Sequence, residues 1–283
     1  MIYRLRHETR FAYDGAVTHG YSEARLLPRA TPRQRILSAA LAVDPEPDDR
    51  SEREDFFGNR VVYLGMAHVH GVLVVTAEAE VDVGAAPEPA EVAWEEARAA
   101  DPQSAQFTLG SPLVELPEGA ERYARKSFTP GRGLLEATRE LTERIHSDFA
   151  YTRGVTTVLT PVSEVLARRR GVCQDFAHLE IACLRSLGLP ARYVSGHLET
   201  GVGAGASHAW CSLRHPDGDW VDFDPTNRLV APGHVTVAWG RDYTDVAPLK
   251  GIVFTEAGHH LSVSVTVRRV EEVAAGEGPR PGL

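Results

Sequence analysis

The strongest constraint on the fold of this chain is a short stretch at residues 171–179 that reads Gly-Val-Cys-Gln-Asp-Phe-Ala-His-Leu. Apolar residues recur through and beyond it at steps of three and four, at Phe176, Leu179, Cys183 and Leu187. This spacing predicts a helix with one apolar face, which Gly188 and Pro190 then end. Cys173 therefore lies at the N-terminus of a helix. Unpaired N–H groups and the positive end of the helix dipole favour a thiolate over a thiol at that position.

Two strand-like segments downstream supply candidate partners for this cysteine. Alternation over residues 206–213 places His208 on one face of a strand, and a second strand-like run over 219–224 ends in Asp224. A His-Pro-Asp-Gly turn between them predicts a hairpin, so a histidine and a carboxylate can meet across the pair. Asp222 lies on the same strand face as Asp224. A Cys–His–Asp relay needs these groups, because the imidazole takes the thiol proton and the carboxylate fixes the imidazole tautomer.

Four motifs in this region resemble those of the bacterial transglutaminase-like proteins, which are papain-like in the design of their active site. In order they read Gly-Val-Cys-Gln-Asp-Phe-Ala-His (171–178), Pro-Ala-Arg-Tyr-Val-Ser-Gly-His (190–197), Ser-His-Ala-Trp-Cys (207–211) and Trp-Val-Asp-Phe-Asp-Pro-Thr-Asn (220–227). The resemblance implies that Cys173 is the nucleophile, His208 the base and Asp224 the acid that orients the histidine. Asp222 competes for the last role, with Asp224 preferred.

The resemblance also implies a reaction. The Cys173 thiolate is expected to attack a peptide or carboxamide carbonyl and form a thioester, which passes to water or to an amine. The expected partners are a peptide or amide substrate and, for transfer, an amine acceptor. Hydrolysis is favoured slightly, because small bacterial proteins of this type lack the extra domains of the calcium-dependent cross-linking enzymes. Two alternatives stay open: a catalytically silent binding module on the same scaffold, and acetyl transfer from a thioester donor.

The expected fold class is α+β, in four parts at residues 1–85, 86–130, 131–275 and 276–283. The first part alternates like strands and is similar to the β-sandwich-like domain that often precedes this core. The second is a linker and irregular connection, rich in Pro, Ala and Glu at its start. The third is the papain-like transglutaminase core, with helices packed on an antiparallel sheet and further strands over 235–239 and 261–270. The last is a disordered tail by composition.

Composition excludes several functions. With 30 basic and 39 acidic residues the formal net charge is −9, which argues against a general binder of nucleic acid or of anionic membranes. No apolar run reaches the about 18 residues of a transmembrane helix. The first residues, Met-Ile-Tyr-Arg-Leu-Arg-His-Glu, lack the apolar segment of a signal peptide, so the cytoplasm is the expected location.

Metal and cofactor sites are not expected. The three cysteines form no Cys-x-x-Cys pair, and Cys183 and Cys211 fall on apolar faces as core thiols. His68 and His70 share a strand face without the further ligands that a metal needs. The proposed reaction requires no metal and no cofactor. A glycine-rich loop at 200–206 is interpreted either as a mobile loop beside the active site or as a plain surface loop. Tyr151 either borders a substrate channel or simply packs.

Overall fold

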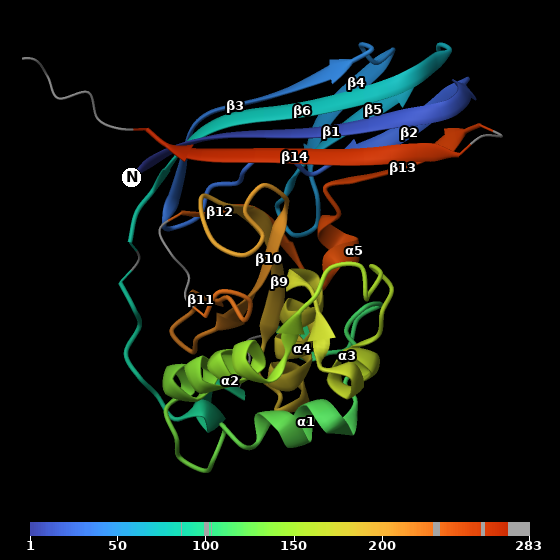
Figure 1. Ribbon diagram of the computed structural model, residues 1–283. Coiled ribbons are helices and arrows are strands. Elements are labelled where there is room, and N and C mark those ends of the chain that lie inside the picture. Colours follow the sequence, from blue (N-terminus) through green and yellow to red (C-terminus); the bar gives the residue numbers. More distant parts are fainter. Residues whose placement is uncertain (86, 99–101, 103, 229–232, 256–257, 271–283) are drawn as a thin grey trace, which may run out of the picture.

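The computed structural model describes residues 1–283 except 86, 99–101, 103, 229–232, 256–257 and 271–283. Strand-rich and helix-rich parts lie one above the other, and the chain crosses between them more than once (Figure 1). No helix within the described ranges is both long and apolar enough to cross a membrane. The tail expected at 276–283 lies outside the described residues.

The strand-rich part is a sandwich of two four-stranded antiparallel sheets. Its strands are β1 (Ile2–Val17), β2 (His19–Ala24), β3 (Gln34–Asp44), β4 (Asp49–Glu54), β5 (Arg60–Met66), β6 (His70–Val83), β13 (Leu249–Phe254) and β14 (His259–Arg269). The sheets have the orders β14-β1-β6-β3 and β13-β2-β5-β4. Alternate residues of β6 from Leu73 to Val83 are buried, and side chains of both sheets meet in one apolar cluster. The apolar residues that alternate along these strands in the sequence therefore form the core of this sandwich.

The C-terminal strands belong to this sandwich. β14 pairs with β1, with Val267 opposite Leu5, and β13 pairs with β2, with Ile252 opposite Tyr21. Figure 1 shows them in red beside the blue N-terminal strands. The strand expected over 261–270 is present, but β13 and β14 join the N-terminal sheets and not the core to which the range 131–275 assigns them. Alternation determines which face of a strand is buried and says nothing about which strand pairs with it.

The helix-rich part surrounds one long buried helix. Its helices are η1 (Trp94–Arg98), η2 (Ala105–Thr108), α1 (Glu118–Ala124), α2 (Leu134–Asp148), α3 (Val162–Arg168), α4 (Cys173–Ser186) and α5 (Tyr243–Val246). The short strand β7 (Ala150–Tyr151) pairs in parallel with β8 (Arg170–Gly171), and β8 leads directly into α4. Residues 86–130 are expected to form a linker and irregular connection. The structure differs there, because Trp94, Tyr123 and Phe128 are buried in the same apolar cluster as α2 and α4, so this segment is part of the core.

A third sheet packs against α4. Its strands are β9 (Ala191–Leu198), β10 (His208–Arg214), β11 (Trp220–Phe223) and β12 (His234–Gly240), in the order β11-β10-β9-β12. Every residue of β9 is buried. The predicted hairpin is confirmed, since Ser212 of β10 lies opposite Asp222 of β11. Apolar residues of α4 and of β9 and β10 share one cluster, which holds the start of the helix beside the start of β10.

Two amide side chains join the sandwich to the outer edge of this sheet. The amide of Gln34 donates to the backbone oxygen of Thr236 (2.7 Å) and accepts from its N–H (2.9 Å). Asn59 makes the same pair of bonds with the backbone of Trp239, at 2.8 and 2.9 Å. Both side chains thus satisfy the free backbone groups of edge strand β12, as a neighbouring strand would.

Candidate active site

Cys173 is the first residue of α4, as the sequence predicts. The carboxylate of Asp175 accepts a hydrogen bond from the Val172 N–H and another from the Thr156 hydroxyl, both at 2.7 Å. These bonds fix the turn that leads into the helix. Gly171 is required there, because a Cβ at that position would lie 2.7 Å from Asp175 Oδ2. Cys173 is partly exposed at this helix start.

The other two cysteines differ sharply from Cys173. Cys183 and Cys211 are fully buried in the apolar core. Burial raises the pKa of the Cys183 thiol and also that of Cys211. Both thiols are therefore held in the neutral form, which is the unreactive one.

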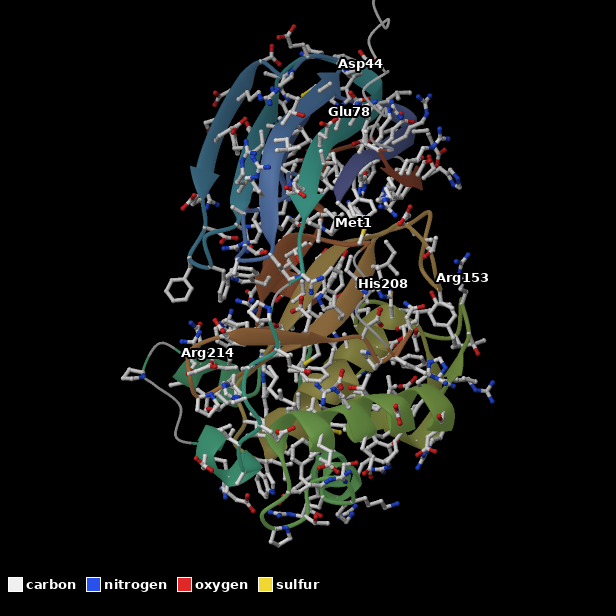
Figure 2. The ribbon with its side chains drawn as sticks, turned by 90° about the vertical axis from the view of Figure 1, so that its left-hand side faces the viewer. Met1, Asp44, Glu78, Arg153, His208 and Arg214 are labelled. Atoms are coloured by element: carbon white, nitrogen blue, oxygen red, sulfur yellow. The ribbon has the colours of Figure 1, made fainter. Side chains whose placement is uncertain are left out.

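His208 and Asp224 meet across the hairpin. The Nε2 atom of His208 lies 2.8 Å from Oδ2 of Asp224, and both side chains are fully buried. His208 lies at the level where the sandwich meets the helix-rich part (Figure 2). Asp222 does not take this position, since its carboxylate pairs with the Arg33 guanidinium at 3.6 Å. The geometry therefore favours Asp224 over its competitor.

Among the described residues, five donors hold the Asp224 carboxylate. Oδ2 accepts from His208, from the Nε2 atom of His234 (2.9 Å) and from the side-chain amide of Asn227 (2.9 Å). Oδ1 accepts from the backbone N–H groups of Thr226 (2.9 Å) and Asn227 (3.2 Å). A buried carboxylate bonded in this way is fixed in place and kept ionised.

The pKa values of the pair follow from these contacts. Burial by itself lowers the pKa of His208, but the hydrogen bond with Asp224 and the interaction with Cys173 outweigh it and raise this pKa to about 9. For Asp224, burial acts to raise the pKa, and the bonds from His208 and His234 outweigh it and hold the pKa well below its usual range. At neutral pH the two side chains therefore form an imidazolium–carboxylate pair.

The second ring nitrogen of His208, Nδ1, is not used by Asp224. Within the described part of the chain, the buried Nδ1 atom has no hydrogen-bond partner. Cys173 raises the pKa of His208, although no hydrogen bond between the sulfur and the ring meets the usual geometric limits. Such contacts are often loose before substrate binds. The indole of Trp210 stacks on the His208 ring at 6.1 Å between centroids and fixes its plane.

Tyr151 lies close to this group. Tyr151 of β7 lies opposite Gly171 of β8, two residues before Cys173. Burial and, after it, the charge of Cys173 raise the pKa of its hydroxyl. Its ring packs edge to face on Phe176, at 6.3 Å between centroids, as the packing interpretation expects. A place at the border of a substrate channel stays a prediction.

Sequence reasoning assigned no role to two of these residues. Asn227 belongs to the Asp-Pro-Thr-Asn motif, and its place directly after Asp224 was an available signal. No sequence motif includes His234, which is the first residue of β12. Only pairing of β12 with β9 brings its ring within reach of Asp224.

His208, Asp224 and His234 also form a possible ligand set, with ligand atoms within 4.8 Å of one another. Two imidazoles and a carboxylate are donors that zinc accepts. In this structure both Nε2 atoms already bond to the same carboxylate oxygen. The arrangement is therefore that of a hydrogen-bond network. On the sandwich, His68 pairs with Asp48 at 2.8 Å.

Comparison with known proteins agrees with both parts of the fold. Residues 3–82 match the family model of the bacterial transglutaminase-like N-terminal region, and residues 121–225 match that of the transglutaminase-like superfamily. The chain is 42% identical to an uncharacterised protein of Mycobacterium tuberculosis, over 94% of this chain and 92% of that protein. It is 33% identical to one of Mycobacterium leprae, over 94% and 98%. A crystal structure from Cytophaga hutchinsonii, described as a candidate cysteine protease, is similar with a TM-score of 0.77 at 23% identity, covering 96% of this chain and 92% of that one.

Proposed function

Since this chain belongs to the bacterial transglutaminase-like family, we propose that it is a cysteine-dependent acyl-transfer enzyme that acts on a peptide or carboxamide bond. The fold expected from the sequence, an α+β transglutaminase-like core behind a strand-rich domain, is confirmed. We assign the proposed acyl-transfer chemistry to Cys173, His208 and Asp224.

In the first half of the proposed reaction, the Cys173 thiolate attacks the carbonyl carbon of the substrate. The negative oxygen that forms is stabilised by backbone N–H groups at the start of α4, including that of Cys173. The carbon–nitrogen bond then breaks, and the leaving amine or ammonia takes a proton from His208. That proton comes from Nδ1, because Nε2 stays bonded to Asp224. A thioester on Cys173 remains.

In the second half, a water molecule or an amine attacks the thioester carbon. Its proton passes to Nδ1 of His208, the carbon–sulfur bond breaks, and the Cys173 thiolate is restored. Water yields a carboxylic acid, and an amine yields a new amide. We favour hydrolysis, with a peptide-like amide as substrate.

One observation carries the proposal: the buried 2.8 Å bond between His208 and Asp224, on a ring whose pKa Cys173 also raises. A silent binding module has no use for an ion pair that is buried and costly to desolvate. The same pair would serve a base that must lose and regain a proton in each cycle.

The test is incubation with a glutaminyl peptide, with and without methylamine, followed by mass spectrometry of the peptide and of the intact protein. Wild-type chain should release ammonia and show a transient mass increase equal to the acyl group. Cys173→Ala should abolish both, because no nucleophile remains. Cys183→Ala, on the same helix, is the matched control and should keep the activity, with circular dichroism reporting on folding. Turnover retained in Cys173→Ala would remove the proposed function.

A further inference from the structure

The glycine-rich loop at residues 200–206 covers the catalytic histidine. Gly203 has a φ of +101°, and a Cβ there would lie 2.5 Å from Nδ1 of His208. Only glycine lets the backbone pass this close to the ring. His208 is 2% exposed, so the loop and the neighbouring core leave its free nitrogen almost no access to solvent.

The loop is fixed at both ends by different parts of the molecule. Asn227 accepts from the Val202 N–H (2.8 Å) and donates to the Val202 oxygen (3.1 Å), while its amide also bonds to Asp224. At the far end, the oxygen of Gly205 accepts from the N–H of Val265 on β14 (3.2 Å). One anchor is therefore Asn227, which also bonds to the Asp224 carboxylate, and the other is β14 of the sandwich.

We propose that residues 201–205 form one wall of the acyl-acceptor site and select acceptors by size. The inference rests on the proposed function. In the second half-reaction the proton of the acceptor goes to Nδ1 of His208, since Nε2 is committed to Asp224. The acceptor must therefore approach Nδ1 beside Gly203. A loop held this close admits a small acceptor, and a long one requires the loop to move.

The experiment lets two amines compete for the same thioester. Methylamine and hexylamine carry the same amino group and differ in length. Wild-type chain should prefer methylamine by about tenfold or more, the scale on which a snug site rejects extra methylenes. Asn227→Ala releases the loop at the catalytic end. Val265→Pro releases it at the sandwich end, because proline lacks the N–H that Gly205 accepts, and edge strands tolerate proline.

Both variants should reduce the preference toward unity, and hydrogen exchange at the Val202 amide should become faster in each. Val263→Pro is the matched control. It lies two residues along the same edge of β14, so its N–H points the same way without contacting the loop. It should keep the wild-type preference.

Three results would overturn the inference. The first is that the wild-type chain shows no preference between the two amines. The second is that neither variant changes the preference of the wild-type chain. The third is that only Asn227→Ala changes the amine preference, while Val265→Pro keeps the wild-type preference although its Val202 amide exchanges faster. That result would assign the effect to Asp224 and not to the loop. If wild-type chain forms no thioester at all, the proposed function fails as well, and the intact mass distinguishes this case from the others.

Discussion

Asp222 and Asp224 show how far two identical residues on one strand face can differ in use. Asp224 is buried and accepts five hydrogen bonds, whereas Asp222 is partly exposed and pairs with Arg33. Alternation along the strand predicted that the two share a face and could not rank them. Contacts from His234 and Asn227, which depend on how the strands pair, are made to Asp224 and distinguish its surroundings from those of Asp222.

Substitution of each aspartate by asparagine tests this difference. Asp224→Asn removes the charge that stabilises the His208 imidazolium and allows the wrong tautomer, so kcat/KM for amide hydrolysis should fall by about a thousandfold or more. Asp222→Asn removes a partly exposed ion pair and should change kcat/KM by no more than about threefold. Steady-state kinetics on the glutaminyl peptide measures both. A larger loss in Asp222→Asn would assign the orienting role to that residue.

At the scale of elements, local signals predicted the parts that carry the site. The helix after residue 172, with Gly188 beyond its end, and the hairpin of β10 and β11 all match their sequence patterns. These patterns span few residues, so short-range geometry determines them. The bond from the Val265 N–H to the Gly205 oxygen, and the pairing of β14 with β1, join residues far apart in the chain. No local pattern encodes such neighbours.

The start of α4 depends on a close approach at Gly171. In Gly171→Ala the new methyl group would lie 2.7–3.0 Å from the side chain of Asp175, so the bond from the Val172 N–H must lengthen or break. We expect a loss of about 1–2 kcal/mol in the free energy of unfolding, the size of a lost helix cap. Amide hydrolysis should also fall, because Cys173 moves with the cap.

Gly119→Ala in α1 is the matched control for this change. Its added Cβ would meet Leu166 at 3.5 Å, an ordinary contact, so it should stabilise the chain by up to about 1 kcal/mol through the better helix propensity of alanine. Urea titration followed by circular dichroism measures both variants. Equal effects of the two substitutions would show that Asp175 adjusts freely and that the close approach at Gly171 is unimportant.

At the scale of the whole molecule, two histidines lie where the sandwich meets the third sheet. The Nδ1 atom of His7 on β1 lies 3.4 Å from Nε2 of His197 on β9, and the other nitrogen of His7 lies 3.0 Å from the hydroxyl of Thr9. Burial lowers the pKa of His7 to about 4 and, with the charge of His7 as a smaller cause, that of His197 to about 3. The junction therefore favours the neutral form of both rings, since no carboxylate of the described residues acts to balance a proton on either.

This junction makes the stability of the chain sensitive to acid. In the unfolded chain these histidines bind protons near pH 6.5, whereas in the folded chain they stay neutral to about pH 4 or below. Their contribution to stability is complete above pH 6.5 and is lost as the pH falls toward the folded values. His178, with a pKa lowered mainly by burial to about 4, acts in the same direction. His208 acts in the opposite direction: with its pKa raised to about 9, it contributes fully below pH 6.5 and loses this contribution as the pH rises to 9.

We therefore expect each buried neutral histidine to lower the free energy of unfolding by about 1.4 kcal/mol per pH unit as the pH falls below 6.5. His197→Gln keeps a hydrogen-bonding amide toward His7 but cannot take up the proton. Its slope between pH 6 and pH 4.5, from urea titrations at each pH, should be smaller than that of the wild type by about this amount. His260→Gln, at an exposed position of β14, should leave the slope unchanged. An identical slope in His197→Gln and the wild type would mean that the junction accepts a proton in the folded state, and acid sensitivity would then have to arise elsewhere in the molecule.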